Sequence, residues 1–512
     1  MAGFYQTPLP KGSFRLLYLY AGADQDDIVG ELKVFPFDSA PEYEALSYVW
    51  GAPEPKKSIN LNGHEVFVGV NLFDALRGLR FLNPSPQLPD APIKERSILR
   101  RSLAKGSRPI AKMWRRYRSR GEMSSREAEE ETPQAEQETS HEIDEMITRY
   151  PICQKRDRWT HGRINTERIF WIDAVCIDQK NNEEKSHQVK MMGSIYKRAQ
   201  TVLIWLGEIV SNELQALPIL SAALEEQADP NFSDNPYPRL DDPSEAPWGY
   251  PPYIDRRWVA LLNFFDKVWF ERIWVIQEVV LATKALVLLG ELEIPWDIVG
   301  AAASWLCRRE LVTAALKYGM LHLGNRSRTM QRLHAAYVIH TTKSHRDIWN
   351  YFTSDFVFKC ALPIDRVYSI LDLFPELNIE PDYSIDPLHA FRATIQQFIE
   401  IKRDLVFLGL VNHGLALSRR SVSTWVRSWP GDPYFEPINS SSEKQRKFYG
   451  ASGDEAFRLL PGPDNTSLRL HGVIVSQVLM RSQFMDRDVE HDSGVVQLFA
   501  AIRDFLSSIR SV

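Results

Sequence analysis

Cysteine is scarce in this sequence. The four cysteines are Cys153, Cys176, Cys307 and Cys360, and no two of them form a Cys-x-x-Cys pair. This spacing excludes the usual zinc-finger pattern and provides no disulfide framework, so it favours a reducing compartment. The histidines show no metal-ligand spacing either, and we predict no metal site.

Long apolar runs and a strong charge of one sign are also missing. The N-terminus has no signal-peptide stretch, and the most apolar region, around 273–289, is interrupted by Gln277, Glu278 and Lys284. The formal net charge of -5 gives no bulk support for nucleic-acid binding. No GxxxxGK[ST] phosphate loop is present, so no nucleotide-driven oligomerisation module is expected. We predict a cytoplasmic protein with no membrane span and no nucleic-acid partner.

The composition is that of an ordinary folded chain. Hydrophobic residues make up 44% of the 512 residues and charged residues 25%, which argues against a wholly disordered or membrane-embedded protein. Residues 45–50 predict a buried strand. Residues 59–61 and 66–68 flank Asn62-Gly63, a dipeptide that favours a tight hairpin turn. Asn71 then reads as the N-cap of a helix.

A strand-helix-strand unit follows further along the chain. Residues 169–173 and 201–207 are apolar runs that predict strands, and between them a helix begins at about Asn182. Such a unit makes a parallel sheet with a right-handed crossover. Next we expect a helix that runs through 269–278, and then a last strand at 285–290. Together these elements predict an α/β fold.

Residues 84–165 interrupt this pattern, because apolar periodicity disappears and a basic block is followed by an acidic one. We predict a disordered insertion. We favour a polyampholyte whose halves neutralise each other over a lipid- or nucleic-acid-binding arm. The predicted organisation is a lead-in at 1–42, a first domain at 43–300 that holds the insertion, and a mainly helical, then short-stranded region at 301–512.

Three segments together resemble the motif blocks of one protein family, in the same order. They are YEALSYVWG at 43–51, a long block from FWIDAVCIDQ to TVLIWLG at 170–207, and WFERIWVIQEVVLA at 269–282. They are similar to the heterokaryon-incompatibility (HET) domains of filamentous fungi. The segment CALPIDRVYSILDL at 360–373 also looks like one that accompanies HET domains. Asp178, His187 and Glu271 depart from the residues more usual at their positions.

The resemblance implies a fold and a candidate catalytic residue. HET domains resemble the TIR fold, a flavodoxin-like parallel sheet with flanking helices, and several TIR domains cleave NAD with one glutamate that follows a tryptophan on a helix. Trp274 and Glu278 have this spacing. At positions i and i+4 they share a helix face, so we expect them to line one pocket. By this resemblance Glu278 is the catalytic candidate, and NAD is a possible substrate, with no cofactor expected.

Open α/β sheets bind ligands beyond the carboxyl ends of their strands. The substrate-binding candidates lie there or near Glu278, and they are Trp50, Gly51, Asp173, Asp178, Gln179, Arg272 and Trp274. Structural alternatives stand beside these roles. In these alternatives Glu278 would pair with Arg272 or a neighbouring basic residue, and the tryptophans would pack in the core. Asp173 would cap the loop after its strand or accept from backbone N–H groups.

Two kinds of function remain open. The resemblance implies an effector of fungal self/non-self recognition and programmed cell death, a form of innate immunity, that acts by TIR-like NAD cleavage. The alternative is a non-enzymatic homotypic adaptor that assembles and recruits a separate executioner. The expected partners are proteins in both cases, either a second HET domain or an allelic incompatibility partner. A stress-responsive relative without an incompatibility role is a third interpretation.

Overall fold

The computed structural model divides the chain into two compact units, Met1–Arg446 and Lys447–Val512. It describes residues 5, 8–52, 54–80, 143–156, 167–209, 212–229, 249–312, 315, 326–346, 351, 357–402, 458–460 and 469–471. In the second unit, β11 (Arg458–Leu460) and β12 (Arg469–His471) form an antiparallel pair. The other described helices and strands belong to the first unit.

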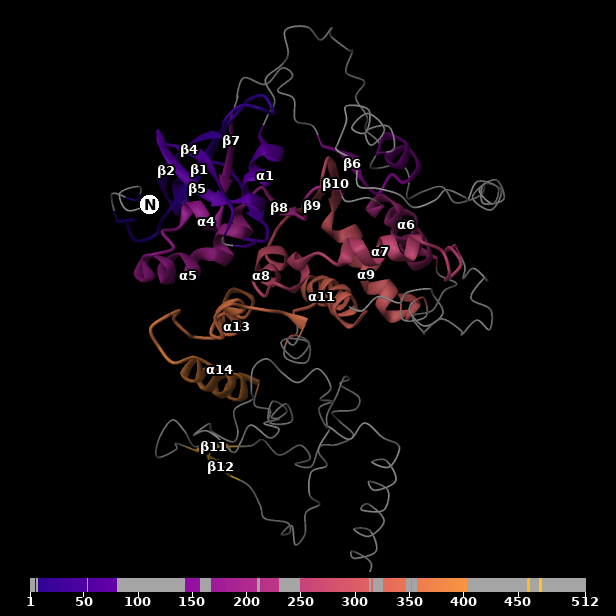
Figure 1. The fold of residues 1–512 in the computed structure, drawn as a ribbon. Coiled ribbons are helices and arrows are strands. Elements are labelled where there is room, and N and C mark those ends of the chain that lie inside the picture. The colour runs from indigo at the N-terminus through magenta and orange to yellow at the C-terminus, as the bar shows by residue number, and fades with distance from the viewer. Residues whose placement is uncertain are drawn as a thin grey trace, which may run out of the picture. The chain divides into compact units, whose positions relative to one another are not determined.

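A mixed sheet of 10 strands forms the centre of the first unit (Figure 1). The strands are β1 (Ser13–Tyr20), β2 (Val29–Pro36), β3 (Glu44–Ser47), β4 (Lys56–Leu61), β5 (His64–Gly69), β6 (Gln154–Lys155), β7 (Glu167–Trp171), β8 (Thr201–Trp205), β9 (Ala285–Leu289) and β10 (Leu292–Pro295). Their order is β5-β4-β2-β1-β7-β3-β8-β9-β10-β6. The predicted α/β class is therefore confirmed.

The longest parallel run is β7-β3-β8-β9. Antiparallel neighbours, β1 and β10, border it on its two sides. The expectation of a fully parallel sheet was therefore wrong for the strands that border this run. Only two residues connect β9 to β10, and a connection this short can join only antiparallel strands. In chain order the four parallel strands stand as 2-1-3-4, the first four positions of the flavodoxin-like order. The TIR-like name itself stays a prediction.

Local sequence explains the hairpin that follows β3. Asn62 and Gly63 both adopt positive φ angles, 53° and 78°, as a tight turn between β4 and β5 requires. The helix α1 (Val70–Leu79) was predicted correctly, but its N-cap is Gly69 and not Asn71. The Asn71 amide instead donates to the Val49 carbonyl oxygen at 2.6 Å and ties the helix to the end of β3.

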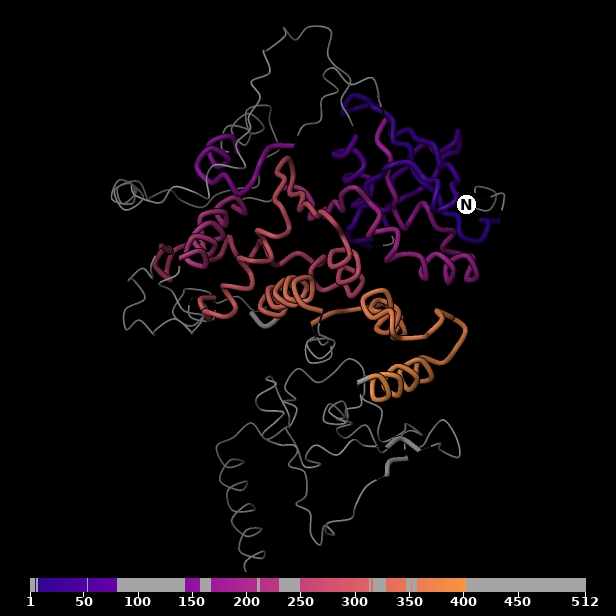
Figure 2. Tube along the Cα trace, turned by 180° about the vertical axis from the view of Figure 1, so that it is seen from behind, coloured from indigo at the N-terminus to yellow at the C-terminus, as the bar shows by residue number. Residues whose placement is uncertain are grey.

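Helices cover the sheet and extend the first unit beyond it. They are α4 (Asp173–Cys176), α5 (Asn182–Arg198), α6 (Leu217–Ala228), α7 (Arg257–Phe265), α8 (Val275–Val280), α9 (Trp296–Arg308), α11 (Arg326–Ser344), α13 (Asp365–Tyr368) and α14 (Pro387–Lys402), with 3-10 turns η1 (Phe37–Ser39), η3 (Glu213–Ala216), η4 (Val268–Glu271) and η6 (Leu371–Leu373). Figures 1 and 2 show α5, α8 and α11 in succession on one side of the strands, and α8 contacts both of the others. None of the described helices combines the length and the apolar character that crossing a membrane requires.

The predicted helix through 269–278 is broken in the structure. The turn η4 ends at Glu271, and α8 begins only at Val275. The break follows from tertiary contacts, because the backbone of residues 271–273 pairs with Lys359 from the C-terminal region. The loop between η4 and α8 carries Arg272.

The predicted insertion is ordered near its end. Residues 143–149 are helical and β6 pairs with β10, with Ile143, Met146 and Cys153 buried. These apolar residues give the segment 143–156 a face to bury, which the charged blocks lack. The charged blocks and the rest of the insertion, 84–142 and 157–165, lie outside the described residues.

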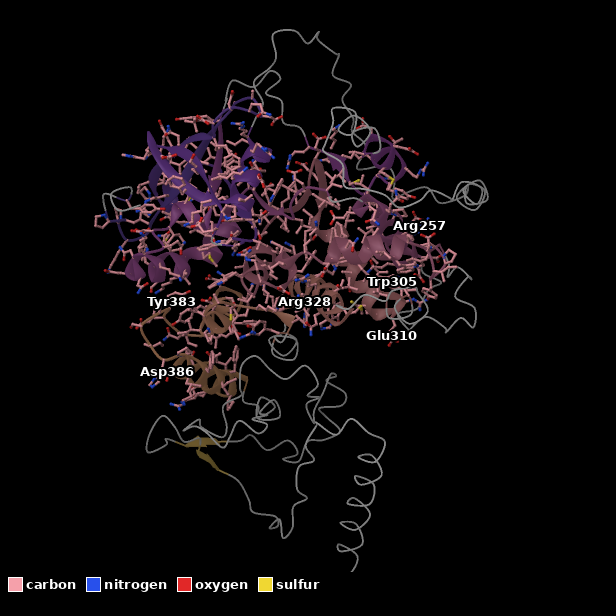
Figure 3. All side chains as sticks on the ribbon, in the orientation of Figure 1. Arg257, Trp305, Glu310, Arg328, Tyr383 and Asp386 are labelled. Atoms are coloured by element: carbon pink, nitrogen blue, oxygen red, sulfur yellow. The ribbon has the colours of Figure 1, made fainter. Side chains whose placement is uncertain are left out.

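The buried carboxylate of Glu226 shows how two helices of the first unit are held together. Glu226 on α6 is fully buried, and its oxygens accept from the Tyr250 hydroxyl at 2.7 Å, Trp305 Nε1 at 2.9 Å and Arg309 Nη2 at 3.1 Å. Trp305 on α9 is labelled in Figure 3. Glu226 therefore links α6 to α9. Both of its carboxylate oxygens accept hydrogen bonds, so neither is left without a partner in the core.

Candidate functional site

The candidate site forms where α8 meets the carboxyl ends of β3 and β7. Both strands are parallel, so the residues after them reach the same edge of the sheet. Ser47 ends β3, Asp173 follows β7, and Glu278 extends from α8 to meet Ser47. The polar groups form one cluster with two ends. The inner end consists of Ser47, Trp269 and Glu278, and the outer end of Trp50 and Asp173.

The inner end is a chain of buried hydrogen bonds with a fixed direction. Trp269 Nε1 donates to Ser47 Oγ at 2.8 Å. An indole N–H is only a donor, so Ser47 turns its own hydroxyl hydrogen toward Glu278 Oε2, its other partner. Each of these three side chains is at most 2% exposed. Glu278 therefore accepts a hydrogen bond at Oε2.

Arg272 supplies the charge that opposes Glu278. Its Nη2 lies 3.4 Å from Glu278 Oε1, so both carboxylate oxygens have donors. Burial raises the pKa of Glu278, while Arg272 and Ser47 act in the opposite direction. The Ser47 hydroxyl and Arg272 Nη2 both donate to the carboxylate, so the geometry places Glu278 as a hydrogen-bond acceptor.

The outer end lies nearer to solvent. Trp50 is 45% exposed, and its Nε1 donates to Asp173 Oδ2 at 2.9 Å. Burial raises the pKa of Asp173, and Arg272 and Trp50 oppose that rise. Gln179 donates its amide to the Asp173 carbonyl oxygen at 2.8 Å and so closes the loop after β7. Gly51 follows Trp50 with a φ of 77°, a backbone conformation that glycine adopts without strain.

Two buried atoms of this cluster have no hydrogen-bond partner. They are Asp173 Oδ1, an acceptor, and Arg272 Nη1, a donor. Native proteins seldom leave such groups unsatisfied. An acceptor and a cationic donor in one cluster are suited to a ligand that carries both hydroxyl groups and anionic oxygens.

Asp178 has contacts that separate it from this cluster. Its Oδ1 accepts from the Lys180 backbone, and its own N–H donates to Glu184 Oε1 at 2.8 Å. Glu184 in turn forms a buried ion pair with Arg15 on β1 at 2.5 Å. These contacts give Asp178 a role in shaping the loop after β7.

Trp274 also differs from its expected place. It is the N-cap of α8, and it packs against a buried cluster that includes Val189, Val367 and Tyr368. The expectation that Trp274 and Glu278 line one pocket is therefore not met. The spacing of four residues holds, but the C-terminal region covers the indole. The tryptophan that the structure places beside Glu278, through Ser47, is Trp269.

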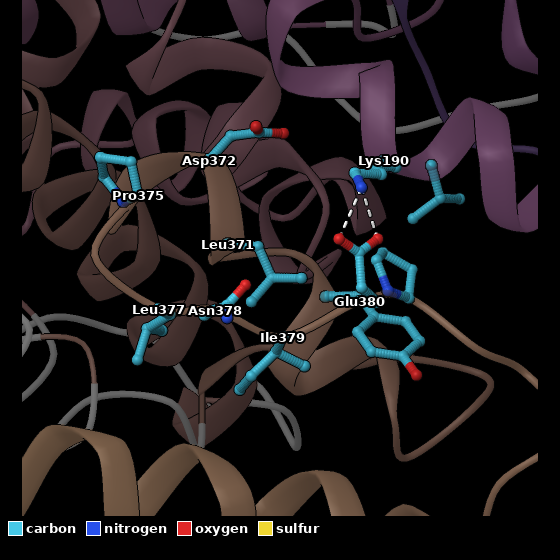
Figure 4. Close-up of a pocket in the computed structure, with 11 residues that line it drawn as sticks. Lys190, Leu371, Asp372, Pro375, Leu377, Asn378, Ile379 and Glu380 are labelled. Carbon is cyan, nitrogen blue, oxygen red and sulfur yellow. Dashed lines mark hydrogen bonds and ion pairs between the residues drawn. The ribbon is translucent and has the colours of Figure 1, made fainter. Parts of the chain in front are cut away.

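A cavity of about 220 Å³ lies elsewhere, between α5 and the segment after α13 (Figure 4). Its lining includes Lys190, Leu371, Asp372 and Glu380. None of the inner-end or outer-end residues lines it. The charged cluster is the better candidate for a catalytic centre than this cavity, because it combines buried charges, strand ends and unpartnered polar atoms.

Sequence reasoning missed several members of the site. Ser47 looked like an ordinary strand residue and Trp269 like a core tryptophan. The charged groups of the cluster also act on Tyr48 and Tyr196, and burial raises the pKa of both well above the ordinary value of 10.0. A polar residue at the end of an apolar strand, as Ser47 is, was the available signal.

Comparisons with known proteins agree with the second and third motif blocks. Residues 117–278 match the family model described as Heterokaryon incompatibility protein (HET). The chain is 24% identical over 374 residues to "Heterokaryon incompatibility protein 6, OR allele" of Neurospora crassa, across 64% of this chain and 54% of that protein. The chain thus spans about half the length of this curated relative. No solved structure matches. The matched residues include the second block and the third block as far as Glu278, the inner-end carboxylate.

Proposed function

We propose that this chain acts in fungal heterokaryon incompatibility and that its HET domain cleaves NAD or a related nucleotide at Glu278. The family match and the name of the Neurospora crassa relative support the biological role. The observation that carries the chemical part is the cluster of Glu278, Arg272 and Asp173 at the carboxyl ends of two parallel strands.

The arrangement suits a reaction that needs no general acid. In NAD the nicotinamide ring is cationic and leaves as a neutral molecule, so the leaving group takes up no proton. Ordinary glycoside hydrolysis needs one carboxyl group to protonate the leaving oxygen and another to stabilise positive charge on the sugar. An ionised Glu278 can do the second task, by accepting from ribose hydroxyls and stabilising the oxocarbenium-like transition state. The bond between the ribose carbon and the ring nitrogen breaks with its electron pair on nicotinamide, and a water molecule adds to the ribose carbon and releases its proton to solvent.

The two unpartnered atoms extend this proposal to substrate binding. Asp173 Oδ1 would accept from a ribose hydroxyl, and Arg272 Nη1 would donate to a phosphate oxygen. The TIR-like part of the proposal is supported by the 2-1-3-4 order of the parallel strands. In such sheets ligands bind where the strand order reverses, which is between β3 and β8 here, and Ser47 of the cluster ends β3.

One observation favours the adaptor as a second candidate. The Glu278 side chain is 2% exposed, and both of its oxygens already have partners. A cluster of this kind also serves a purely structural role. In that case the HET domain assembles with a second copy or an allelic partner and recruits a separate executioner.

The test compares two buried glutamates of the same chain. Glu278→Gln is expected to lower NAD cleavage by the purified full chain at least about a hundredfold, because the negative charge at the sugar is lost. Glu226→Gln is the matched control, since it also removes a buried, ion-paired carboxylate but lies outside the cluster. Circular dichroism and thermal unfolding establish that each variant is folded.

The outcomes separate the two candidates. Equal NAD cleavage by wild type and Glu278→Gln overturns the catalytic role. Killing of cells by Glu278→Gln at matched protein levels, without loss of cellular NAD, supports the adaptor. If both variants lose NAD cleavage when the rate is expressed per folded molecule, the loss comes from removing any buried charge and not from the chemistry of Glu278.

A further inference from the structure

The loop that carries Arg272 forms backbone hydrogen bonds with a segment that follows α11. We call residues 357–381 the clamp. The Lys359 N–H donates to the Glu271 carbonyl at 2.5 Å, and the Ile273 N–H donates to the Lys359 carbonyl at 2.9 Å. These two bonds form a parallel bridge around Arg272. The position of the Arg272 backbone therefore depends on the clamp.

Side chains of the clamp also hold the start of α8. Trp274 packs on Val367 and Tyr368 of the clamp. Asp372 Oδ2 accepts from Gln277 Nε2 at 2.8 Å and from the Gly193 N–H at 3.0 Å, so one carboxylate joins α8 to α5. The approach is so close that a Cβ at Gly193 would lie 2.3 Å from Asp372 Oδ2. Gln277 directly precedes Glu278, so this contact acts one residue from the candidate catalytic group.

The junction between the clamp and the helices is incompletely packed. The cavity of about 220 Å³ lies in it, beside Asp372, and Figure 4 shows the ion pair of Lys190 and Glu380 across it. That ion pair is exposed, with 55% and 69% of the side chains accessible, so it contributes little. Gln277 Oε1 is buried and has no hydrogen-bond partner. A cavity and an unsatisfied buried oxygen both lower the free energy needed to separate the parts.

The other end of α8 is held differently. Lys343 on α11 donates to the carbonyl oxygens of Val279 at 3.1 Å and Ala282 at 2.6 Å. These bonds satisfy C-terminal carbonyls that a helix otherwise leaves free. The end of α8 nearest Lys343 is thus fixed independently of the clamp. Opening of the clamp junction frees the start of α8 while its far end remains anchored.

We propose that the clamp keeps the Glu278 site closed and that release of the clamp from α5 and α8 exposes the Glu278 carboxylate. The proposal deepens the proposed function and rests on it for its biological meaning, since a closed effector must open before it meets a nucleotide. Its physical content is a local opening equilibrium, in which the loosely packed junction separates before the sheet does. A partner that binds the clamp would shift that equilibrium and so act as the trigger.

The experiment measures exposure of Glu278 directly in the full chain. A carbodiimide with a small amine labels accessible carboxylates, and mass spectrometry quantifies the label on Glu278. Asp372→Ala removes the acceptor shared by Gln277 and Gly193, and we expect it to raise the labelling rate roughly tenfold, the factor that about 1.4 kcal/mol produces. Asp372→Asn keeps an acceptor oxygen and is expected to restore most of the wild-type rate. Glu376→Ala, an exposed carboxylate of the same clamp, is the matched control and should label like wild type.

NAD cleavage by the same samples separates this proposal from the proposed function. Faster labelling of Glu278 together with faster NAD cleavage in Asp372→Ala supports both. Faster labelling without NAD cleavage in any sample supports the clamp and overturns the proposed chemistry. An unchanged labelling rate in Asp372→Ala overturns the clamp, as does faster labelling accompanied by wild-type or slower NAD cleavage in a chain that cleaves NAD.

Discussion

The inner and outer ends of the polar cluster are built from similar groups but in different environments. At the inner end, Glu278 is buried and both of its oxygens have donors. At the outer end, Asp173 has one unpartnered oxygen and contacts the exposed Trp50. The comparison shows how one cluster can combine two roles. The inner end holds a charge in place, and the outer end retains unused bonding capacity for a ligand.

Arg272 joins the two ends, because its charge lowers the pKa of both carboxyl groups. Replacing Arg272 should therefore have the largest effect on stability, because it acts on both ends. Arg272→Ala leaves the buried Glu278 and the partly buried Asp173 without their cation, and we expect it to lower the free energy of unfolding by about 3–5 kcal/mol. Urea unfolding measures the loss. Arg77→Ala, which breaks a half-exposed pair with Asp74, is the control and should cost less than about 1 kcal/mol. If both variants lost the same free energy of unfolding, Arg272 would not be the cation that stabilises Glu278 and Asp173 together.

Ser47→Ala tests the inner end alone. It leaves Glu278 Oε2 and Trp269 Nε1 without their shared partner, so we expect a loss of about 1–3 kcal/mol in the free energy of unfolding. Ser47 lowers the pKa of Glu278, so the loss should shrink as the pH falls toward the ordinary glutamate value of 4.5 and the carboxyl becomes protonated. Denaturant unfolding at several pH values measures both effects. Ser58→Ala on the exposed face of β4 should change stability by less than about 0.5 kcal/mol, and a pH-independent Ser47 effect would contradict the hydrogen-bond direction.

Trp50→Phe tests the outer end and should have the smallest effect. It keeps an aromatic ring but removes the N–H that Asp173 accepts, with an expected loss of about 0.5–1.5 kcal/mol. Thermal unfolding of wild type, Trp50→Phe and Ser47→Ala in one series gives the ranking. A loss at Trp50 as large as that at Ser47 would remove the distinction between the two ends.

The sequence predicted much of the local structure around the site. The apolar runs of β7, β8 and β9, the hairpin at Asn62-Gly63 and the start of α5 were all readable, because each depends on neighbouring residues. The strands β1 and β2 were not predicted, although the apolar run in Ser13–Tyr20 was a usable signal. The break between η4 and α8 had no local signal, since it arises from pairing with Lys359.

The candidate residues show the same division. Glu278, Arg272 and Asp173 were named from the motif blocks, and the structure brings them into one cluster. Trp274 was named for its spacing from Glu278. The spacing of four residues holds, but the Trp274 side chain packs against Val367 and Tyr368 of the clamp.

By itself, the sequence determined the α/β class, the parallel central strands and the likeness of three segments to the motif blocks of HET domains, because these follow from periodicity, turn residues and recognisable segments. Only the tertiary structure decided which groups touch Glu278. Its partner Ser47 is 231 residues away, and the clamp that holds α8 follows the motif blocks in the chain. Contacts across such separations form when the chain buries its apolar faces together, and no local pattern encodes which polar groups then meet.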